Sequence, residues 1–301
     1  MGLGVAIETS ELDALVVQPE ARLLQPVPCA PRLTAASCEP VREIQVVDEN
    51  GDHRRIQVPA ERALTVFVDE RELVTLMTLG AAPEFLVLGY LYNQRLIDNA
   101  AQIESITVDW QLGSAAVKTR SPLHELKARS ARRLATTACG QGSVFGDLMT
   151  QIDAIRLPGI SVARIRQSTL HRLLETMRRT RNIHGSAGSV HSCALFRGAD
   201  LLVSVEDVGR HNAVDTITGW MVMHGVAGAD KILFTTARLT SEMVMKAAQS
   251  GIPIAVSRNG VSTMAFDLAT RLGMTLFGRA VNRHFLCYVG AERVDAEPAA
   301  D

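Results

Sequence analysis

The sequence predicts an α/β and α+β protein, with a smaller N-terminal α+β domain followed by a larger α/β domain. Two observations carry this prediction. Short runs rich in β-branched residues, separated by turn signals, fill residues 43–120 and leave room for one helix. From about residue 160, apolar strand-like runs alternate with helical patterns of roughly 10–15 residues, which is typical of a layered sheet.

In the first domain, strands are predicted where apolar and β-branched residues cluster, at 43–47, 55–58, 63–68, 103–108 and 114–119. Asn50-Gly51 is a hairpin signal between the first two. Pro83 is suited to the first turn of a helix. The spacing of the following apolar residues places one face of that helix on Phe85, Leu88, Leu91 and Tyr92.

In the second domain, the helical patterns cover residues 160–180, 209–225, 239–251 and 261–273. Gly251 and Gly273 are expected to close the last two helices. The apolar runs predict strands at 192–196, 201–207, 231–237, 252–257, 274–278 and 284–289. Ligands of such sheets bind beyond the ends of the strands.

Composition narrows the function classes. The chain has 301 residues, 31 Lys and Arg against 32 Asp and Glu, and 4% aromatic residues, which disfavours a nucleic-acid binder. Five widely spaced cysteines favour a reducing compartment over a disulfide framework. The N-terminus lacks a signal-peptide pattern, and the longest apolar run, 85–92, is too short to span a bilayer. A cytoplasmic protein without membrane attachment is expected.

The predicted boundaries divide the chain into five parts. Residues 1–42 contain five prolines and are expected to form a variable, flexible extension. Residues 122–137 are basic, typical of a solvated helix face or a linker. The parts are an extension at 1–42, the first domain at 43–137, a cysteine and glycine loop with linker at 138–150, the second domain at 151–293, and a tail at 294–301.

Arginines follow four predicted strands of the second domain, where each strand ends. They are Arg210, Arg238, Arg258 and Arg279. An arginine fork matches a phosphate, and helix N-termini near residues 210 and 240 would add backbone donors, so a polyanion site is predicted. Two alternatives stay open: Glu206, Asp207 and Glu242 could neutralise the arginines, and residues 240–242 could form a helix cap.

Cys139 is the candidate reactive group. Gly140 and Gly142 let the backbone bend closely around it, and the basic segment upstream favours its thiolate. A buried, inert cysteine is the alternative interpretation. Cys193 and Cys287 lie inside apolar runs and are predicted to belong to the core.

A metal site is not favoured by the sequence. No Cys-x-x-Cys pair is present, and the deaminase signature of a histidine, a glutamate and paired cysteines is missing. His184 and His191 flank a glycine turn and remain candidates for ligands or acid–base groups.

Four motifs are similar to those of the FdhD family of formate dehydrogenase accessory sulfurtransferases. They are HGSAGSVHSCALF at 184–196, EDVGRHNAVD at 206–215, ARLTSEMVMKA at 237–247 and GIPIAVSRN at 251–259. The helix ending in RLGMTLFG at 271–278 also resembles the family, and TLMTLGAAPEFLVLGYLYNQRLI at 75–97 looks like its first domain. The resemblance covers residues 43–293.

The resemblance implies a sulfur carrier with a cytidine-deaminase-like second domain. It would take sulfur from a cysteine desulfurase as a persulfide on Cys139 and pass it to the molybdenum cofactor, bis-molybdopterin guanine dinucleotide. That cofactor would be a client ligand that the protein delivers to the formate dehydrogenase catalytic subunit. The protein itself would hold no permanent metal. A homodimer is implied, with no nucleic-acid partner. The cofactor segment maps to Arg279, Ala280, Val281, Asn282, Arg283 and His284, and phosphate or guanine contacts are expected from Arg210, His211, Arg238, Ser241 and Arg258.

Two positions depart from the family pattern. The loop has Gly142 where the family has a second cysteine, so a relay between two thiols on this loop is excluded, although one thiol can carry a persulfide. The cofactor segment has Asn282-Arg283-His284 where the family commonly has a glycine before the closing arginine.

Two other functions remain open. One is a non-catalytic chaperone that binds the molybdenum cofactor or a guanine nucleotide and has lost sulfur transfer with the second cysteine. The other is a cysteine hydrolase using Cys139, His191 and Asn212, whose residue types permit covalent catalysis.

Overall fold

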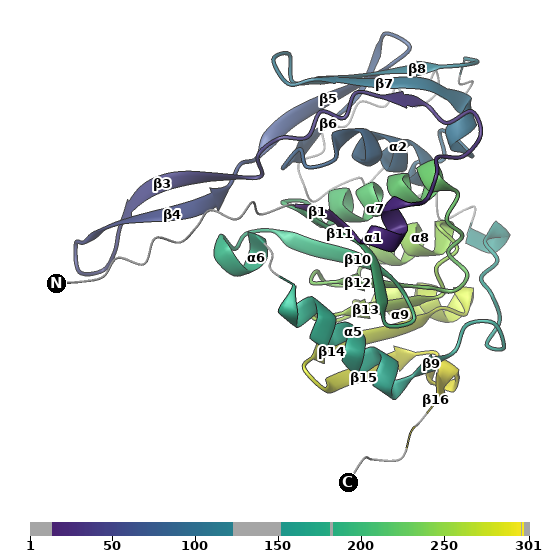
Figure 1. The fold of residues 1–301 in the computed structure, drawn as a ribbon. Helices are drawn as coiled ribbons and strands as arrows, with labels where there is room; N and C mark the ends of the chain where they lie inside the picture. The colour runs from purple at the N-terminus through teal and green to yellow at the C-terminus, as the bar shows by residue number, and fades with distance from the viewer. Residues whose placement is uncertain (1–13, 123–151, 181–182, 296, 298–301) are drawn as a thin grey trace.

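The chain folds around two sheets, one of five strands and one of seven (Figure 1). The computed structural model describes residues 14–122, 152–180, 183–295 and 297. The predicted combination of an α+β part and an α/β part is confirmed. The cytidine-deaminase-like character of the second domain stays a prediction.

The first sheet has the strand order β2-β7-β8-β5-β6. Its strands are β2 (Arg32–Leu33), β5 (Arg62–Val68), β6 (Arg71–Thr78), β7 (Ile103–Asp109) and β8 (Ser114–Thr119). Strand β6 was not predicted; it begins with Arg71 and Glu72 at an exposed end and then alternates partly and fully buried residues. The hairpin of β3 (Val41–Val47) and β4 (His53–Pro59) projects from the body, and Gly51 in its turn has φ +83°.

Helix α2 (Pro83–Asn93) begins at the proline, as predicted, but it is not buried along one face only. It lies between the first sheet and α7 (Arg210–His224), so nearly its whole circumference is covered. The two helix backbones meet at Gly89 and Gly219. A Cβ at Gly89 would lie 1.7 Å from the carbonyl oxygen of Asp215, so only glycine fits at this contact.

The second sheet has the order β1-β11-β10-β12-β13-β14-β15. Its strands are β1 (Leu15–Val17), β10 (His191–Arg197), β11 (Asp200–Asp207), β12 (Lys231–Thr235), β13 (Ile254–Ser257), β14 (Thr275–Val281) and β15 (His284–Val289). β12, β13 and β14 are parallel, and β10 is antiparallel to both β11 and β12. All six strands predicted for the second domain are present.

Helices cover both faces of the second sheet. Alternate strand residues pack against α7, α8 (Ser241–Gln249) and α9 (Thr263–Leu272) on one face, and against α5 (Gln167–Arg179) on the other. Gly251 and Gly273 have positive φ at the helix ends, as their predicted closing role requires. Helix α5 starts later than predicted, because Ile165 and Arg166 form β9, which pairs with β16 (Val294–Asp295).

The described part of the N-terminal extension contributes to both sheets. β1 pairs with β11, α1 (Pro19–Arg22) follows it, and β2 pairs with β7. The remaining short elements are α6 (Ile183–Ser186), η1 (Ala100–Gln102), η2 (Ile152–Ala154) and η3 (Ala291–Arg293). None of the helices in the described ranges combines the length and the apolar character that a bilayer span requires.

The α2–α7 contact makes a prediction about stability. Gly89→Ala should lower the free energy of unfolding by about 3 kcal/mol or more, because its methyl group would overlap backbone that cannot move aside. Gly260→Ala is the matched control, since a Cβ there meets nothing within 4 Å. Urea denaturation of both variants measures the difference, and equal stabilities would contradict the close contact.

Candidate functional site

The carboxyl ends of four strands lie at one edge of the second sheet. β11 and β12 are both antiparallel to β10 and therefore run in the same direction, which β13 and β14 share. The strand ends that precede Arg210, Arg238 and Arg258 thus reach the same edge, and Arg279 lies near the end of β14. The tertiary structure places the predicted arginines along this edge, as a site beyond the strand ends requires.

Hydrogen bonds join the loops that carry these arginines. Asn259 donates from Nδ2 to the carbonyl of Thr236 at 2.6 Å, and its own carbonyl accepts from the Arg279 N–H at 2.8 Å. The loop after β12, the loop after β13 and strand β14 are therefore linked through one residue. Arg258, next to Asn259, projects from this linked backbone and is exposed.

Asp207 fixes the start of α7 and ties it to the first domain. Its carboxylate accepts hydrogen bonds from the Thr78 hydroxyl at 2.5 Å, the Leu79 N–H at 3.2 Å, the Gly209 N–H at 2.9 Å and Asn212 Nδ2 at 3.0 Å. Burial raises the pKa of Asp207 to about 6, although these donors favour the ionised form. These four donors are all uncharged, so the hydrogen bonds of Asp207 are structural, and its neutralisation of arginines stays an untested alternative.

The first turns of α7 and α8 meet through His211 and Glu242. Nε2 of His211 lies 2.9 Å from Oε2 of Glu242, within ion-pair distance but not aligned as a hydrogen bond. Burial lowers the pKa of His211, and the neighbouring Glu242 carboxylate acts in the opposite direction. The side chain nearest to the Glu242 carboxylate is therefore a predicted site residue, His211.

Four buried polar atoms near these helix starts have no hydrogen-bond partner among the described residues. They are Arg210 Nε, His211 Nδ1, His211 Nε2 and Thr240 Oγ1. Thr240 occupies the N-cap position of α8, but its hydroxyl makes no capping bond, so the capping interpretation of residues 240–242 is wrong for this side chain. Unpaired buried polar groups are costly, and an anionic ligand could satisfy donors here.

Polar pairs continue along the interface of α7 and α8, beyond the first turns of these helices. Lys246 Nζ contacts both carboxylate oxygens of Asp215, at 2.6 and 2.7 Å, and the pair is almost completely buried. Asn93 of α2 donates to Asp215 at 2.7 Å and to Thr218 at 3.2 Å. Because one unpaired charge here would be costly, these contacts hold α2, α7 and α8 in one arrangement.

Residues of the predicted cofactor segment line two neighbouring cavities. Arg258, Val281 and Asn282 line a cavity of about 210 Å³, and Asn282 and Arg283 line another of about 660 Å³. Ala280 differs, because its side chain is buried in the core beneath α5.

The remaining predicted residues lie at or near the edge. Arg238, Arg279 and His284 are exposed, and Ser241 is half-buried at the first position of α8. Arg238 lines neither of the two cavities.

Cys193 and Cys287 both pack against apolar cores, on opposite faces of the second sheet. Cys193 is fully buried, and burial raises the pKa of its thiol to about 12. Cys287 is only half-buried, and burial raises its pKa as well. Cys139 lies outside the described residues, and so do the side chain of His184 and the loop glycines Gly140 and Gly142.

Glu206, named as a possible neutraliser of arginines, and Asn212, named for the hydrolase hypothesis, have structural contacts. Glu206 accepts hydrogen bonds at 2.5 Å from the Ser192 hydroxyl and from the N–H of Ile183. Asn212 donates at 2.6 Å to the carbonyl of Met77, in addition to its bond to Asp207. His191 begins β10 and is half-buried. Within the described ranges, no three His, Cys, Asp or Glu side chains are grouped so that they could hold a metal ion.

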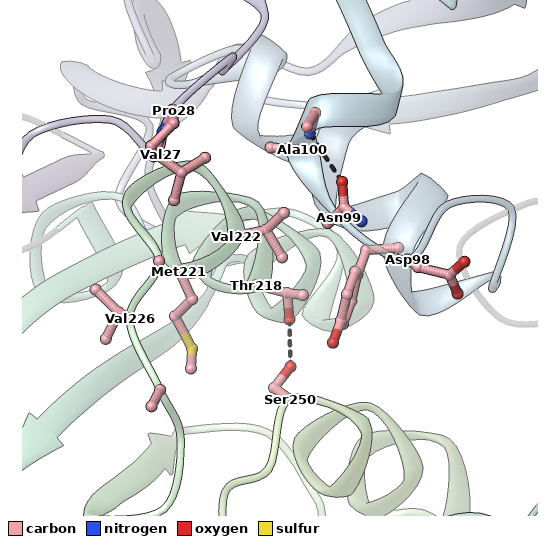
Figure 2. Close-up of a pocket in the computed structure, with 14 residues that line it drawn as sticks. Val27, Pro28, Asp98, Asn99, Ala100, Thr218, Met221, Val222, Val226 and Ser250 are labelled. Atoms are coloured by element: carbon pink, nitrogen blue, oxygen red, sulfur yellow. Dashed lines mark hydrogen bonds between the residues drawn. The ribbon is translucent and has the colours of Figure 1, made fainter. Parts of the chain in front are cut away.

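A separate cavity of about 410 Å³ lies at the other end of α7 (Figure 2). Val27, Met221, Val222 and Val226 form much of its apolar lining. The hydroxyl groups of Thr218 and Ser250 meet there at 3.1 Å, where the polar contacts between α7 and α8 end. The sequence analysis did not anticipate this cavity, because its lining comes from segments far apart in the chain.

The fold and the strand ends together define an α/β protein whose second sheet carries arginines along the carboxyl ends of its strands. The FdhD/NarQ family profile matches residues 59–295, and the chain belongs to that family. The resemblance to the FdhD family, predicted from the strand-end motifs, is therefore confirmed.

Individual relatives cover most of the chain. The sulfur carrier protein FdhD of Bacillus licheniformis is 30% identical over 251 residues, which are 82% of this chain and 94% of the relative. That of Halalkalibacterium halodurans is 29% identical over 252 residues, 83% and 93% of the two chains. A crystal structure from Desulfotalea psychrophila, described as a formate dehydrogenase accessory protein, matches with a TM-score of 0.67 and 25% identity. It covers 86% of this chain and 100% of the other.

Sequence reasoning missed two contributions to this region. Asn259 joins the loops, and the only signal for it was its place directly after Arg258 at a strand end. Arg178 lines both cavities from α5, where the sequence indicated only an amphipathic helix.

The raised pKa of Asp207 predicts how stability depends on pH. Between about pH 4 and 6 the folded state keeps a proton that the unfolded state has lost, so the free energy of unfolding falls as the pH rises. Raising the pKa of Asp207 from 3.8 to about 6 corresponds to about 3 kcal/mol of free energy. Asp207→Asn removes this titration.

Urea denaturation at about pH 4.5 and about pH 7 tests this prediction. From about pH 4.5 to about pH 7, the free energy of unfolding of the wild-type protein should fall by roughly 2 kcal/mol more than that of Asp207→Asn. All other groups titrate in both proteins, so the difference reports Asp207 alone. An identical pH dependence of the two proteins would show that Asp207 does not keep its proton.

Proposed function

We propose that this protein is a sulfur carrier for formate dehydrogenase. It takes sulfur from a cysteine desulfurase persulfide and passes it to bis-molybdopterin guanine dinucleotide before that cofactor enters the enzyme. The observation that carries the proposal is the set of arginine-bearing strand ends at one sheet edge, in a member of a family that includes sulfur carrier proteins. The client ligand is a polyanion, which suits this edge.

The ligand is held by the edge residues in this proposal. Arg258, Val281 and Asn282 already line one cavity, and Arg258 supplies a planar fork suited to phosphate. Arg210 and Ser241 stand at the first positions of α7 and α8, where backbone N–H groups and the helix dipole favour an anion. The unpaired His211 Nδ1 adds a polar group for the ligand.

Cys139 carries the sulfur in this proposal, supported by its sequence context of glycines and upstream basic residues. Its thiolate attacks the outer sulfur of the desulfurase persulfide. A new S–S bond forms while the desulfurase cysteine leaves as a thiolate. In the second transfer the S–S bond on Cys139 breaks, its electron pair returns to Cys139, and the client cofactor supplies the electron pair that binds the sulfur atom.

The other thiols of the second domain are unsuited to this chemistry. Cys193 is sealed in the core, and its raised pKa keeps it protonated. Burial also disfavours the thiolate of Cys287. The proposed partners are a cysteine desulfurase, the formate dehydrogenase catalytic subunit and a second copy of this chain. We place these encounters in the cytoplasm, where free thiols persist.

The sulfur step predicts a site-specific persulfide. Incubation with a cysteine desulfurase and cysteine should add about 32 Da, one sulfur atom, to the peptide containing Cys139. Cys139→Ala should abolish this adduct and formate dehydrogenase maturation while leaving the fold intact. Cys29→Ser, which removes an exposed thiol, is the matched control and should behave as wild type.

Two outcomes would contradict the carrier role. One is full maturation by Cys139→Ala in a host lacking its own copy of the protein. The other is absence of the adduct under conditions that label a relative with two loop cysteines. The second outcome would favour the non-catalytic chaperone, which the glycine at position 142 also suits.

The ligand step predicts affinity for a guanine nucleotide. Guanosine diphosphate should bind the wild-type protein, and the double variant Arg238→Ala and Arg258→Ala should bind at least about tenfold more weakly, because charge-assisted contacts to phosphate are lost. Calorimetric titration measures the affinity. Unchanged binding by the double variant would remove these arginines from the site.

A further inference from the structure

Helix α5 places an additional set of arginines beside the residues assigned to the cofactor. Arg178 and Asn282 each line both the 210 Å³ and the 660 Å³ cavity, so the two cavities are adjacent and share part of their lining. We call the pair of cavities the α5 trough. One wall is the second half of α5, and the other is formed by the ends of β12, β13 and β14.

The charge of the α5 trough is strongly one-sided. Among the described residues, its lining contains five arginines and a single carboxylate, Glu175. The arginines are Arg172, Arg178, Arg179, Arg258 and Arg283. Convergent arginines with so little acidic compensation match a ligand that carries several phosphate charges.

Glu175 is shared between two of these arginines. Arg178 forms a two-pronged contact with it at 2.7 and 2.8 Å, and Arg179 Nε approaches it at 2.5 Å. Hydrogen bonding from Arg178, followed by Arg179, lowers the pKa of Glu175 to about 2. These side chains are substantially exposed, and such surface pairs exchange readily for a better partner.

The walls of the trough are held at a defined separation. The apolar residues Leu170, Leu173, Leu174 and Met177 pack α5 onto the sheet, so its basic side faces outward. His171 Nε2 lies 3.1 Å from the carbonyl of Arg283, which joins the helix to the β14–β15 connection.

The backbone opposite α5 is in an uncommon conformation. Arg279 has φ +51° and Asn282 has φ +56°, and the β14–β15 pairing shifts register between Gly278 and Val281. Left-handed non-glycine residues and bulges are concentrated at binding sites, where they redirect side chains.

We propose that the α5 trough is a phosphate-binding arm of the ligand site, in which Arg172 and Arg178 contact the phosphates of an extended nucleotide ligand. This inference deepens the proposed function and rests on it. The larger, basic cavity takes the phosphates that lie farther along the ligand. In the smaller cavity Arg258 keeps its phosphate contact, while Phe234, Met177 and Val281 border a less polar part of the ligand. When phosphate binds, Arg178 breaks its contact with Glu175 and contacts the phosphate instead.

Calorimetric titration of the full chain with guanosine diphosphate and with pyrophosphate tests the arm. The double variant Arg172→Ala and Arg178→Ala should weaken binding of both probes by about tenfold or more, with a shallower dependence on salt. Arg55→Ala, which removes one positive charge from the projecting β3–β4 hairpin, should stay within about twofold of wild type.

Glu175→Gln tests the exchange in the opposite direction. It removes the one carboxylate found in the described lining of the trough and releases both arginines, so binding of both probes should tighten by about threefold or more. A variant that merely disturbed α5 would weaken binding instead. Thermal unfolding confirms that each variant is folded.

The outcomes separate this inference from the function on which it rests. If the α5 double variant and Glu175→Gln both bind like wild type while Arg258→Ala weakens binding, the α5 arm is wrong and the sheet-edge site stands. If neither probe binds the wild-type protein, the arm and the nucleotide site are both wrong. The persulfide on Cys139 then decides the carrier role independently.

Discussion

The close contact of α2 with α7 is the constraint on which the rest of the structure depends. Two glycines allow the helix backbones to touch, and a Cβ at either position would overlap the other helix. Beside this contact, Asn93 of α2 bonds to Asp215 of α7, which is paired with Lys246 of α8. Since α7 also covers one face of the second sheet, this packing sets the first domain against the second. Loss of the contact would therefore disturb both domains.

The same arrangement determines where the ligand edge lies. Helix α7 begins after Asp207, whose carboxylate accepts from Thr78 and Leu79 of the first domain. Arg210 and His211 then follow in the first turn, so their positions depend on both domains. On the opposite face of the sheet, α5 reaches the edge independently and brings Arg178 beside Asn282. The candidate site is thus built from helices on both faces of one sheet, joined at the edge by the loops that Asn259 links.

Much of the candidate site was predictable, because its signal is local. An apolar run followed by Gly, Arg and polar residues indicates a strand that ends at a ligand-binding edge, and Arg258 and Asn282 indeed line one cavity. The contribution of α5 was not predictable in this way. Arg178 and Glu175 have the spacing of an ordinary solvated ion pair on a helix, and nothing in that pattern identifies the β14–β15 connection as the opposing wall. Ala280 shows the converse, since its place in the segment does not reveal that its side chain points into the core.

The sequence by itself determined the type and place of most elements, the helix ends at Gly251 and Gly273, and the arginines at the strand ends. Apolar periodicity and the backbone freedom of glycine act over a few residues, so the chain displays them directly. Only the tertiary structure decided that β10 lies between β11 and β12, that α2 is buried nearly all round, and that α5 faces Asn282. These features depend on pairings between residues far apart in the chain, whose free energy comes from joint burial and is present in neither segment alone.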